Sequence, residues 1–269
     1  MVEDTMNVNV GPAIYVAGFE GVGISLSGSG AGYIHEAWLG QYQPGRTKAP
    51  DTATAILLDG AHHFIFLTVT FHTRIVLTSD FFPSYLLNKQ MKGAQHDCDV
   101  NNVIVWSGLV GVNTTNGANR LQGVHTWNDA GKNGGTGIRL HKGSGRVEQC
   151  YLDYAPLVIG CPATESHHAT LAMVEGNLFL GSSTIVLEAL DKAAYAAGLV
   201  VTNNIFHTWN NANRTFVLDE TNGKFAGVVN TIVDGNEVGP SVEKVGKIGT
   251  RATVGDNRLF TVTFCAKSC

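Results

Sequence analysis

A short apolar segment followed by a turn containing Asn or Gly recurs along this chain, and this repeat constrains the fold more than any other feature. The segments QCYLDY, EGNLFLG, TNNIFHTW and DGNEVG align on Cys150, Asn177, Asn204 and Asn236, at steps of 27, 27 and 32 residues. Val124 and Asn102 extend the series upstream, at steps of 26 and 22 residues. Steps of this length, with β-branched runs and Gly or Asn turns, are typical of the coils of a β-solenoid.

Each coil of such a solenoid contributes about three short strands, and inward side chains stack on the next coil about 4.8 Å away. An Asn that recurs once per coil can hydrogen-bond to its equivalent in the next coil. The 3.6-residue period of a helical repeat is not sustained anywhere in the chain. We therefore predict an all-β fold in which residues 1–269 form one right-handed parallel β-helix, with stacked coils over residues 100–240.

The composition excludes several other classes of protein. Charged residues make up 15% of the chain, below the roughly 25% usual for globular domains, and the chain has 32 glycines, which argues against a helical bundle. The net charge of −4 argues against a nucleic-acid partner. No stretch approaches the roughly 18 apolar residues that a membrane span needs. We expect a monomer that contacts neither nucleic acid nor membrane.

The cysteines and histidines do not indicate a metal site. Five cysteines, an odd number without CxxC spacing, give little support to a zinc site. His62, His63 and His72 have no acidic partner at ligand spacing. We therefore predict no metal and no cofactor.

Two segments depart from the repeat. Residues 61–94 are rich in Phe and β-branched residues but lack the Gly and Asn turns, so we predict an insertion that projects from the stack. A translated, unspliced intron is the alternative explanation for this segment. Residues 241–269 follow the last recognised repeat and are expected to form a C-terminal cap or tail.

Several strings come in the order expected for one family: HEAWLGQ (35–41), TAILLDG (54–60), QGVHTWNDAGKNGGTGIRL (122–140), QCYLDY (149–154), NLFLGSSTIVLEAL (177–190) and GLVVTNNIF (198–206). Together they resemble the plant QUARTET-type polygalacturonase-like proteins of the pectin-lyase-like superfamily, over roughly residues 15–60 and 95–240. The GVH…GGTGI block followed by CYLDY is the most specific part. The NTD, DD, GHG and RIK strings of polygalacturonases are absent, so the resemblance implies a fold and a substrate class more firmly than a mechanism.

The resemblance also implies a partner and a location. The expected partner is an acidic polysaccharide such as pectin or homogalacturonan, and the family is extracellular or in the cell wall. Family members are usually longer and begin with a secretion signal and earlier coils. The segment MVEDTMNVNV has no apolar core of a signal peptide, so we expect this chain to lack the N-terminal coils.

Strand alternation brings a group of candidate residues to one face. In GVHTWND it turns His125, Trp127 and Asp129 outward, and in CYLDY it turns Tyr151 and Asp153 outward. The 26-residue step predicts that His125 lies beside Tyr151, and Trp127 beside Asp153. Asp129 then lies one coil from Asp153 and is displaced along the strand.

This arrangement suggests glycoside hydrolysis, which uses one carboxylic acid and one carboxylate. We predict that Asp129 and Asp153 are the catalytic pair, with His125 beside them. Their expected separation, about 8 Å from strand spacings, lies within the roughly 6.5–9.5 Å of inverting enzymes. The alternative is structural: Asp153 caps a turn and His125 is an ordinary surface histidine.

A basic cluster near this site suggests an anionic ligand. Five of the 18 Lys and Arg residues fall within 27 residues: Arg120, Lys132, Arg139, Lys142 and Arg146. We predict that Arg139 and Lys142 bind the galacturonate carboxylate and that Trp127, Tyr151 and His207 contact the sugar rings. A solvated loop is the alternative explanation of the cluster.

Three functions follow in order of preference. The first is a polygalacturonase-like hydrolase that cleaves pectic chains with two carboxylates. The second is a catalytically inactive β-helix that only binds polysaccharide or serves structurally. The third is a calcium-dependent pectate lyase, which would need clustered acidic ligands.

Overall fold

The structure, a computed structural model, describes residues 8–17, 22–28, 32–40, 54–60, 63–66, 69–71, 74–78, 98–106, 110–114, 119–127, 135–141, 144–163, 172–181, 183–208, 216–229 and 231–238.

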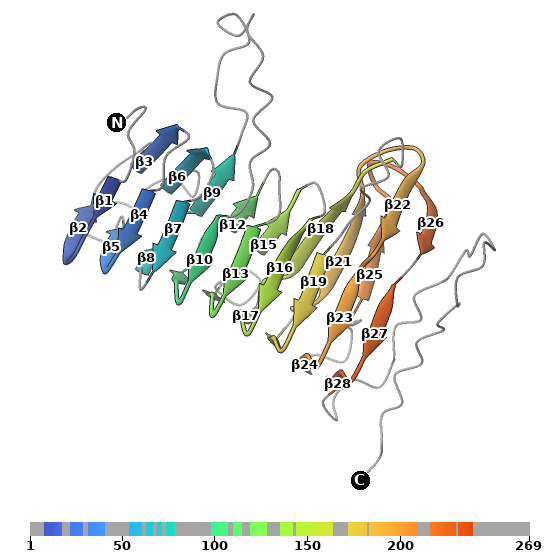
Figure 1. Cartoon of the computed structure of the whole chain (residues 1–269). Helices are drawn as coiled ribbons and strands as arrows, with labels where there is room; N and C mark the ends of the chain where they lie inside the picture. The colour runs from blue at the N-terminus through green and yellow to red at the C-terminus, as the bar shows by residue number, and fades with distance from the viewer. Residues whose placement is uncertain are drawn as a thin grey trace, which may run out of the picture.

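The described elements are all strands, and they build three long parallel sheets (Figure 1). The first sheet contains, in order, β1 (Val8–Val10), β4 (Gly32–His35), β7 (His63–Phe66), β10 (Asp99–Asn101), β13 (Asn119–Gln122), β16 (Gly145–Glu148), β19 (Ala172–Glu175), β23 (Val200–Thr202) and β27 (Ile232–Asp234). The second contains β2 (Ile14–Ala17), β5 (Ala37–Gly40), β8 (Val69–Phe71), β11 (Ile104–Trp106), β14 (His125–Trp127), β17 (Tyr151–Asp153), β20 (Leu178–Gly181), β24 (Ile205–Thr208) and β28 (Glu237–Val238).

The third sheet contains β3 (Val22–Gly28), β6 (Thr54–Gly60), β9 (Arg74–Thr78), β12 (Val110–Thr114), β15 (Thr136–Leu140), β18 (Leu157–Cys161), β21 (Ile185–Ala189) and β25 (Phe216–Asp219). A separate pair, β22 (Ala194–Ala197) and β26 (Phe225–Val229), is also parallel. Each coil thus places one strand in each sheet, and the strand of the next coil pairs with it. The prediction of a parallel β-helix is confirmed.

The corner between the first and second sheets is a tight turn that repeats from coil to coil. Its first residue has a positive φ, as in Asn102 (50°), Gly123 (61°) and Gln149 (52°), a conformation that Gly and Asn adopt most readily. The next residue points into the core, so Val103 is the equivalent of Val124. The predicted alignment of Asn102 with Val124 was therefore wrong by one residue. The two adjacent positions of this turn can both be Asn, so residue type alone does not tell them apart.

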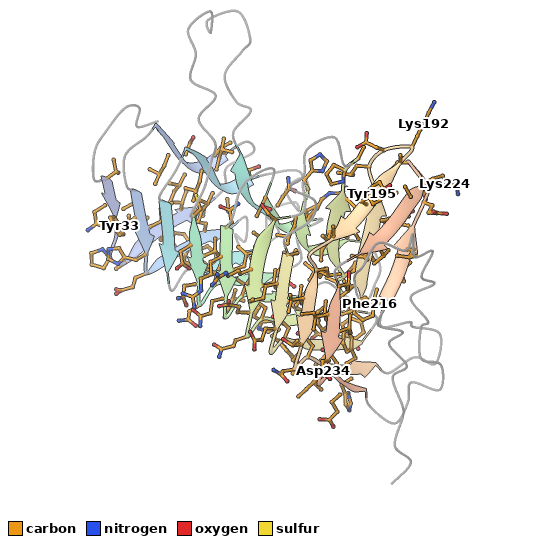
Figure 2. All side chains as sticks on the ribbon, turned by 45° about the vertical axis from the view of Figure 1, so that its right-hand side comes forward. Tyr33, Lys192, Tyr195, Phe216, Lys224 and Asp234 are labelled. Carbon is orange, nitrogen blue, oxygen red and sulfur yellow. The ribbon has the colours of Figure 1, made fainter. Side chains whose placement is uncertain are left out.

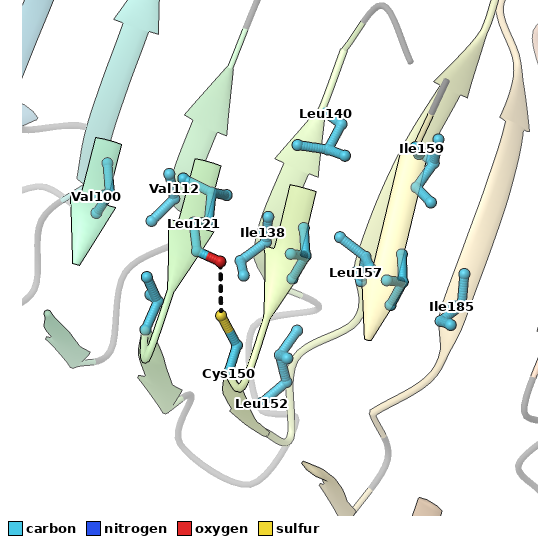
Figure 3. Close-up of a cluster of buried hydrophobic side chains, with 14 of the residues drawn as sticks. Val100, Val112, Leu121, Ile138, Leu140, Cys150, Leu152, Leu157, Ile159 and Ile185 are labelled. Carbon is cyan, nitrogen blue, oxygen red and sulfur yellow. Dashed lines mark hydrogen bonds between the residues drawn. The ribbon is translucent and has the colours of Figure 1, made fainter. Parts of the chain in front are cut away.

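An asparagine ladder occupies this inward turn position in later coils. Asn177 Oδ1 accepts from Cys150 N (2.8 Å), Asn204 Oδ1 accepts from Asn177 N (2.9 Å), and Asn236 Oδ1 accepts from Asn204 N (2.9 Å). The ladder confirms the predicted coil-to-coil hydrogen bonds. Cys150 continues the column, and its thiol donates to Leu121 O at 3.4 Å (Figure 3).

The core is a column of stacked apolar side chains inside the three sheets. Leu121, Ile138, Leu152 and Leu157, from four different strands, are all fully buried (Figure 3). Burial also raises the pKa of the Cys150 thiol to about 12, so it stays protonated. Several outward side chains are exposed, as Tyr33 on the first sheet illustrates (Figure 2). The inside of the helix is therefore structural, and any binding surface lies on the outer faces.

The predicted insertion at residues 61–94 is wrong for the part that the structure describes. The strands β7, β8 and β9 pair in register with the coils on both sides, for example Phe64 with Tyr33 and with Asp99. They complete a regular coil. A parallel strand needs an extended backbone and a neighbouring strand, and it does not need the Gly and Asn turn residues that other coils have. Residues 79–97 lie outside the described residues, as does the predicted cap or tail at 241–269.

Among the described residues, no helix is long and apolar enough to cross a membrane.

Candidate functional site

The predicted neighbours on the second sheet do lie side by side. In the pairing of β14 with β17, His125 is opposite Tyr151 and Trp127 is opposite Asp153. The residues between them, Thr126 and Leu152, are buried, so the four predicted site residues face outward and are partly exposed. This register was predicted correctly, whereas the chemical roles of these residues stay predictions.

Burial changes the protonation of this group. It raises the pKa of Asp153, which favours the neutral carboxylic acid, and it lowers the pKa of His125, which favours the neutral imidazole. Tyr151 also has a raised pKa, from burial and from the charge of Asp153. The rings of His125 and Tyr151 meet edge to face with centroids 4.3 Å apart, and His125 Nε2 is buried without a hydrogen-bond partner in the described part of the chain.

The predicted basic cluster is divided between faces. Arg120 and Arg146 point outward from the first sheet, and Arg120 pairs there with Glu148 (3.0 Å). Arg139 belongs to β15 of the third sheet. The composite site expected from the sequence is therefore split, because the chain turns a corner between β14 and β15. Asp129, Lys132 and Lys142 lie outside the described residues.

His207 is exposed on β24, and its place on the second sheet agrees with the predicted row of outward residues. It is opposite Leu180, which in turn is opposite Asp153. Two coils therefore separate His207 from Asp153 on the same face.

The third sheet carries a charged pair that the sequence analysis did not identify as a site. Arg139 forms a salt bridge with Glu188 of β21, two coils further along. Between them lies β18, where Gly160 is directly opposite Glu188 and has no side chain to obstruct the arginine. Glu188 is only 7% exposed although it points outward, and a buried carboxylate paired with a guanidinium is uncommon on an outer sheet face.

A second carboxylate stands beside Glu188 on the next coil. Asp219 of β25 is the register partner of Glu188. Its carboxylate accepts from Thr221 Oγ1 (2.6 Å) and from Thr221 N (2.9 Å), and these bonds lower the pKa of Asp219, with a smaller contribution from the charge of Arg139. Asp219 is thereby kept ionised. Asn222 Nδ2 donates to Glu188 Oε1 at 3.4 Å.

The outer face of the third sheet is more sheltered than the other two faces. Its outward residues Leu57 and Val158 are each only 7% exposed. By contrast, Ile104 and Ile205 on the second sheet are 40% and 42% exposed, and Tyr33 on the first is 44% exposed. Charged groups on this face are therefore partly removed from water.

Asn113 adds an unsatisfied polar group to this face. It is the register partner of Arg139, and its Oδ1 atom is buried with no hydrogen-bond partner among the described residues. Buried polar atoms normally have a partner, so an unpaired acceptor beside an arginine suits a ligand that donates hydrogen bonds.

Glu188 had a weak sequence signal. In TIVLEAL, the alternation of Ile185, Leu187 and Ala189 marks an inward row, and Glu188 is the charged residue of the outward row. Its pairing with Arg139 could not be read from the sequence, because 49 residues separate the two. Among the described residues, no group of three or more His, Cys, Asp and Glu side chains lies close enough to hold a metal ion.

Comparison with curated proteins shows a related sequence. The chain is 31% identical over 172 residues to Polygalacturonase QRT3 of Arabidopsis thaliana. The match covers 63% of this chain and 34% of the relative, so the chain spans about a third of that protein's length. No protein-family model and no solved structure matches the chain. The sequence similarity and the three-sheet parallel β-helix together fit a polygalacturonase-like protein of the pectin-lyase-like superfamily.

Proposed function

We propose that this chain acts on pectic, galacturonate-containing polysaccharide as a glycoside hydrolase, on the outer face of the third sheet. The observation that carries the proposal is the sheltered Arg139–Glu188 pair with Asp219 in register beside it. The similarity to a relative named polygalacturonase supports the substrate class. An acidic polysaccharide partner, an extracellular or cell-wall location and a monomeric state follow from the proposal as predictions.

The register of β21 and β25 gives the two carboxylate residues a backbone spacing compatible with this reaction. Register partners on adjacent parallel strands have Cα atoms about 4.8 Å apart, and glycoside hydrolases hold their carboxyl groups roughly 5–9.5 Å apart. Asp219, which Thr221 keeps ionised, is suited to act as the second carboxylate. This group either attacks the sugar as a nucleophile or activates a water molecule as a base. In this proposal Glu188 is the acid that protonates the leaving oxygen.

Arg139 is the residue that we expect to bind the substrate carboxylate. A galacturonate carboxylate is a strong partner for a guanidinium and would compete with Glu188 for Arg139. Once Arg139 turns to the substrate, Glu188 loses the cation that it pairs with in the structure. The unpaired Asn113 Oδ1 is available to accept a hydrogen bond from a sugar hydroxyl.

The pair predicted from the sequence, Asp129 and Asp153, is a competing proposal for the acid and base. The raised pKa of Asp153 favours a protonated acid on the second sheet. Arg139 was expected near Asp153 but lies on a different sheet. This alternative therefore has no Arg139 side chain beside Asp153 to bind the galacturonate carboxylate. For this reason we rank the third-sheet pair first.

Substitution of the carboxylates tests the proposal. We expect Glu188→Gln and Asp219→Asn each to reduce reducing-sugar release from polygalacturonate by about a hundredfold or more, the usual contribution of a positioned acid or base. Glu237→Gln, at an exposed carboxylate of the second sheet, is the matched control and should retain activity. Circular dichroism of each variant verifies that it is folded.

The possible outcomes separate the candidate functions. Full activity in Glu188→Gln, together with loss of activity in Asp153→Asn and Asp129→Asn, would assign catalysis to Asp129 and Asp153 instead of the third-sheet pair. Absorbance from an unsaturated product that disappears with chelator would indicate a calcium-dependent lyase. No product of either kind from the wild-type chain, with retained binding to polygalacturonate, would indicate an inactive binding protein.

A further inference from the structure

The outer face of the second sheet has a row of apolar and aromatic residues that the proposed reaction does not use. The pairings of five consecutive strands align Ile104, His125, Tyr151, Leu178 and Ile205. We call these five residues the second-sheet strip. Ile104 and Ile205 are 40% and 42% exposed, and the other three are partly exposed. At about 4.8 Å per strand, the strip is about 20 Å long.

The same row continues towards the N-terminal coils. Tyr15 of β2 is opposite Trp38 of β5, and their rings stack with centroids 4.3 Å apart and planes inclined by only 7°. Through Val69 of β8, the register then passes from Trp38 to Ile104. Tyr15 is 63% exposed, so a flat aromatic face is open to solvent in line with the strip.

The charges on this face do not suit an acidic polysaccharide. Among the outward residues that the structure describes on the second sheet, the charged ones are the acids Asp153 and Glu237, with no Lys or Arg. His125 is neutral, because burial lowers its pKa. Without a Lys or Arg among its described outward residues, this face has no cation to attract a polyuronate, which leaves an uncharged chain as the better partner.

We propose that the second-sheet strip binds an uncharged polysaccharide chain, whose apolar sugar faces pack on Tyr151, His125 and the flanking aliphatic residues. Aromatic side chains suit this ligand because they offer a large apolar face with a polar edge. The third sheet carries the cation and the carboxylates, whereas the second carries the apolar strip. This inference extends beyond the proposed hydrolysis and does not depend on it.

Native affinity electrophoresis of the full chain tests the inference. The gels contain hydroxyethyl cellulose as the neutral polymer or polygalacturonate as the acidic one. We expect the neutral polymer to retard the wild-type chain, and Tyr151→Ala to weaken this binding about tenfold, as loss of aromatic packing of about 1.5 kcal/mol implies. Ile205→Thr, a milder change on the same strip, should weaken it to a smaller extent. Tyr33→Ala, at an exposed tyrosine on the first sheet, should leave it unchanged.

Three results would overturn the inference. The first is an unretarded wild-type chain in the neutral polymer. The second is retardation by polygalacturonate alone that Tyr151→Ala abolishes, since the strip would then bind the acidic substrate. The third is self-association in sedimentation that depends on Tyr151, which would make the strip a protein interface. Measuring the same binding in Glu188→Gln keeps this result separate from any loss of hydrolysis.

Discussion

Asp153 and Asp219 show how the position of a carboxyl group on the outer face changes its chemistry. Burial raises the pKa of Asp153 above its ordinary value of 3.8. Hydrogen bonds from Thr221 lower the pKa of Asp219 below that value. The two groups therefore affect stability with opposite signs as the pH changes.

The pH dependence of unfolding measures these two signs. In the folded state Asp153 binds its proton more tightly than in the unfolded state, so its ionisation destabilises the protein as the pH rises from 3.8 through the raised pKa. Asp153→Asn should therefore gain melting temperature relative to wild type between about pH 3 and pH 7. Thermal unfolding across this range gives the difference directly.

Asp219→Asn serves as the internal comparison and should behave in the opposite way. The stability that ionised Asp219 contributes is present above its ordinary value of 3.8 and is lost as the pH falls through the lowered pKa. This variant should lose melting temperature relative to wild type at neutral pH and recover it in acid. Curves of the same sign for both variants would contradict the pKa directions.

At the scale of the element, the turns between the first and second sheets fix how the strands stack. The asparagine ladder satisfies buried backbone donors in one coil with the side chain of the next. Asn204 also accepts from Asn177 Nδ2 at 2.9 Å, and it donates to Val174 O at 3.0 Å and to Asn236 Oδ1 at 2.8 Å, so one side chain connects three coils. These positions recur in the sequence at steps of 27, 27 and 32 residues, which is why they could be predicted.

Removal of one ladder residue should be costly. Asn204→Ala leaves Asn177 N, Asn177 Nδ2 and Val174 O without this partner in a buried position. We expect the free energy of unfolding to fall by about 2–4 kcal/mol, measured by urea denaturation, since each buried unsatisfied group costs about 1–3 kcal/mol. Asn101→Ala, whose side chain makes a contact of 3.5 Å with Gln122, should lose less than about 0.5 kcal/mol. Equal losses in both variants would reject a special role for the ladder.

In the whole molecule, the sheets join each coil mainly to its two neighbours. The order of strands in all three sheets follows the order of coils, as in other solenoids. Stability in such a stack is approximately a sum of terms for each coil and each interface between neighbours. A local change should therefore weaken nearby coils more than distant ones.

Hydrogen exchange after a core substitution in the last described coil tests this behaviour. Val233 of β27 packs against the core, and Val233→Ala removes part of that contact. We expect faster amide exchange in β27 and its neighbour β23, with unchanged protection in β13 and β10. A uniform loss of protection across all strands would mean that the stack unfolds as one cooperative unit.

The sequence by itself determined the approximate coil period, the inward and outward alternation and the pairing of His125 with Tyr151, because these depend only on strand geometry and on a recurring step of similar length. The tertiary structure decided on which of the three sheets each outward residue lies. Arg139 turns onto the third sheet and meets Glu188 across Gly160, a contact set by the corners of the coil and by a register two coils away. The regular coil formed by β7, β8 and β9 was likewise decided by pairing with neighbours, since parallel strands need a partner on each side and no particular turn residues.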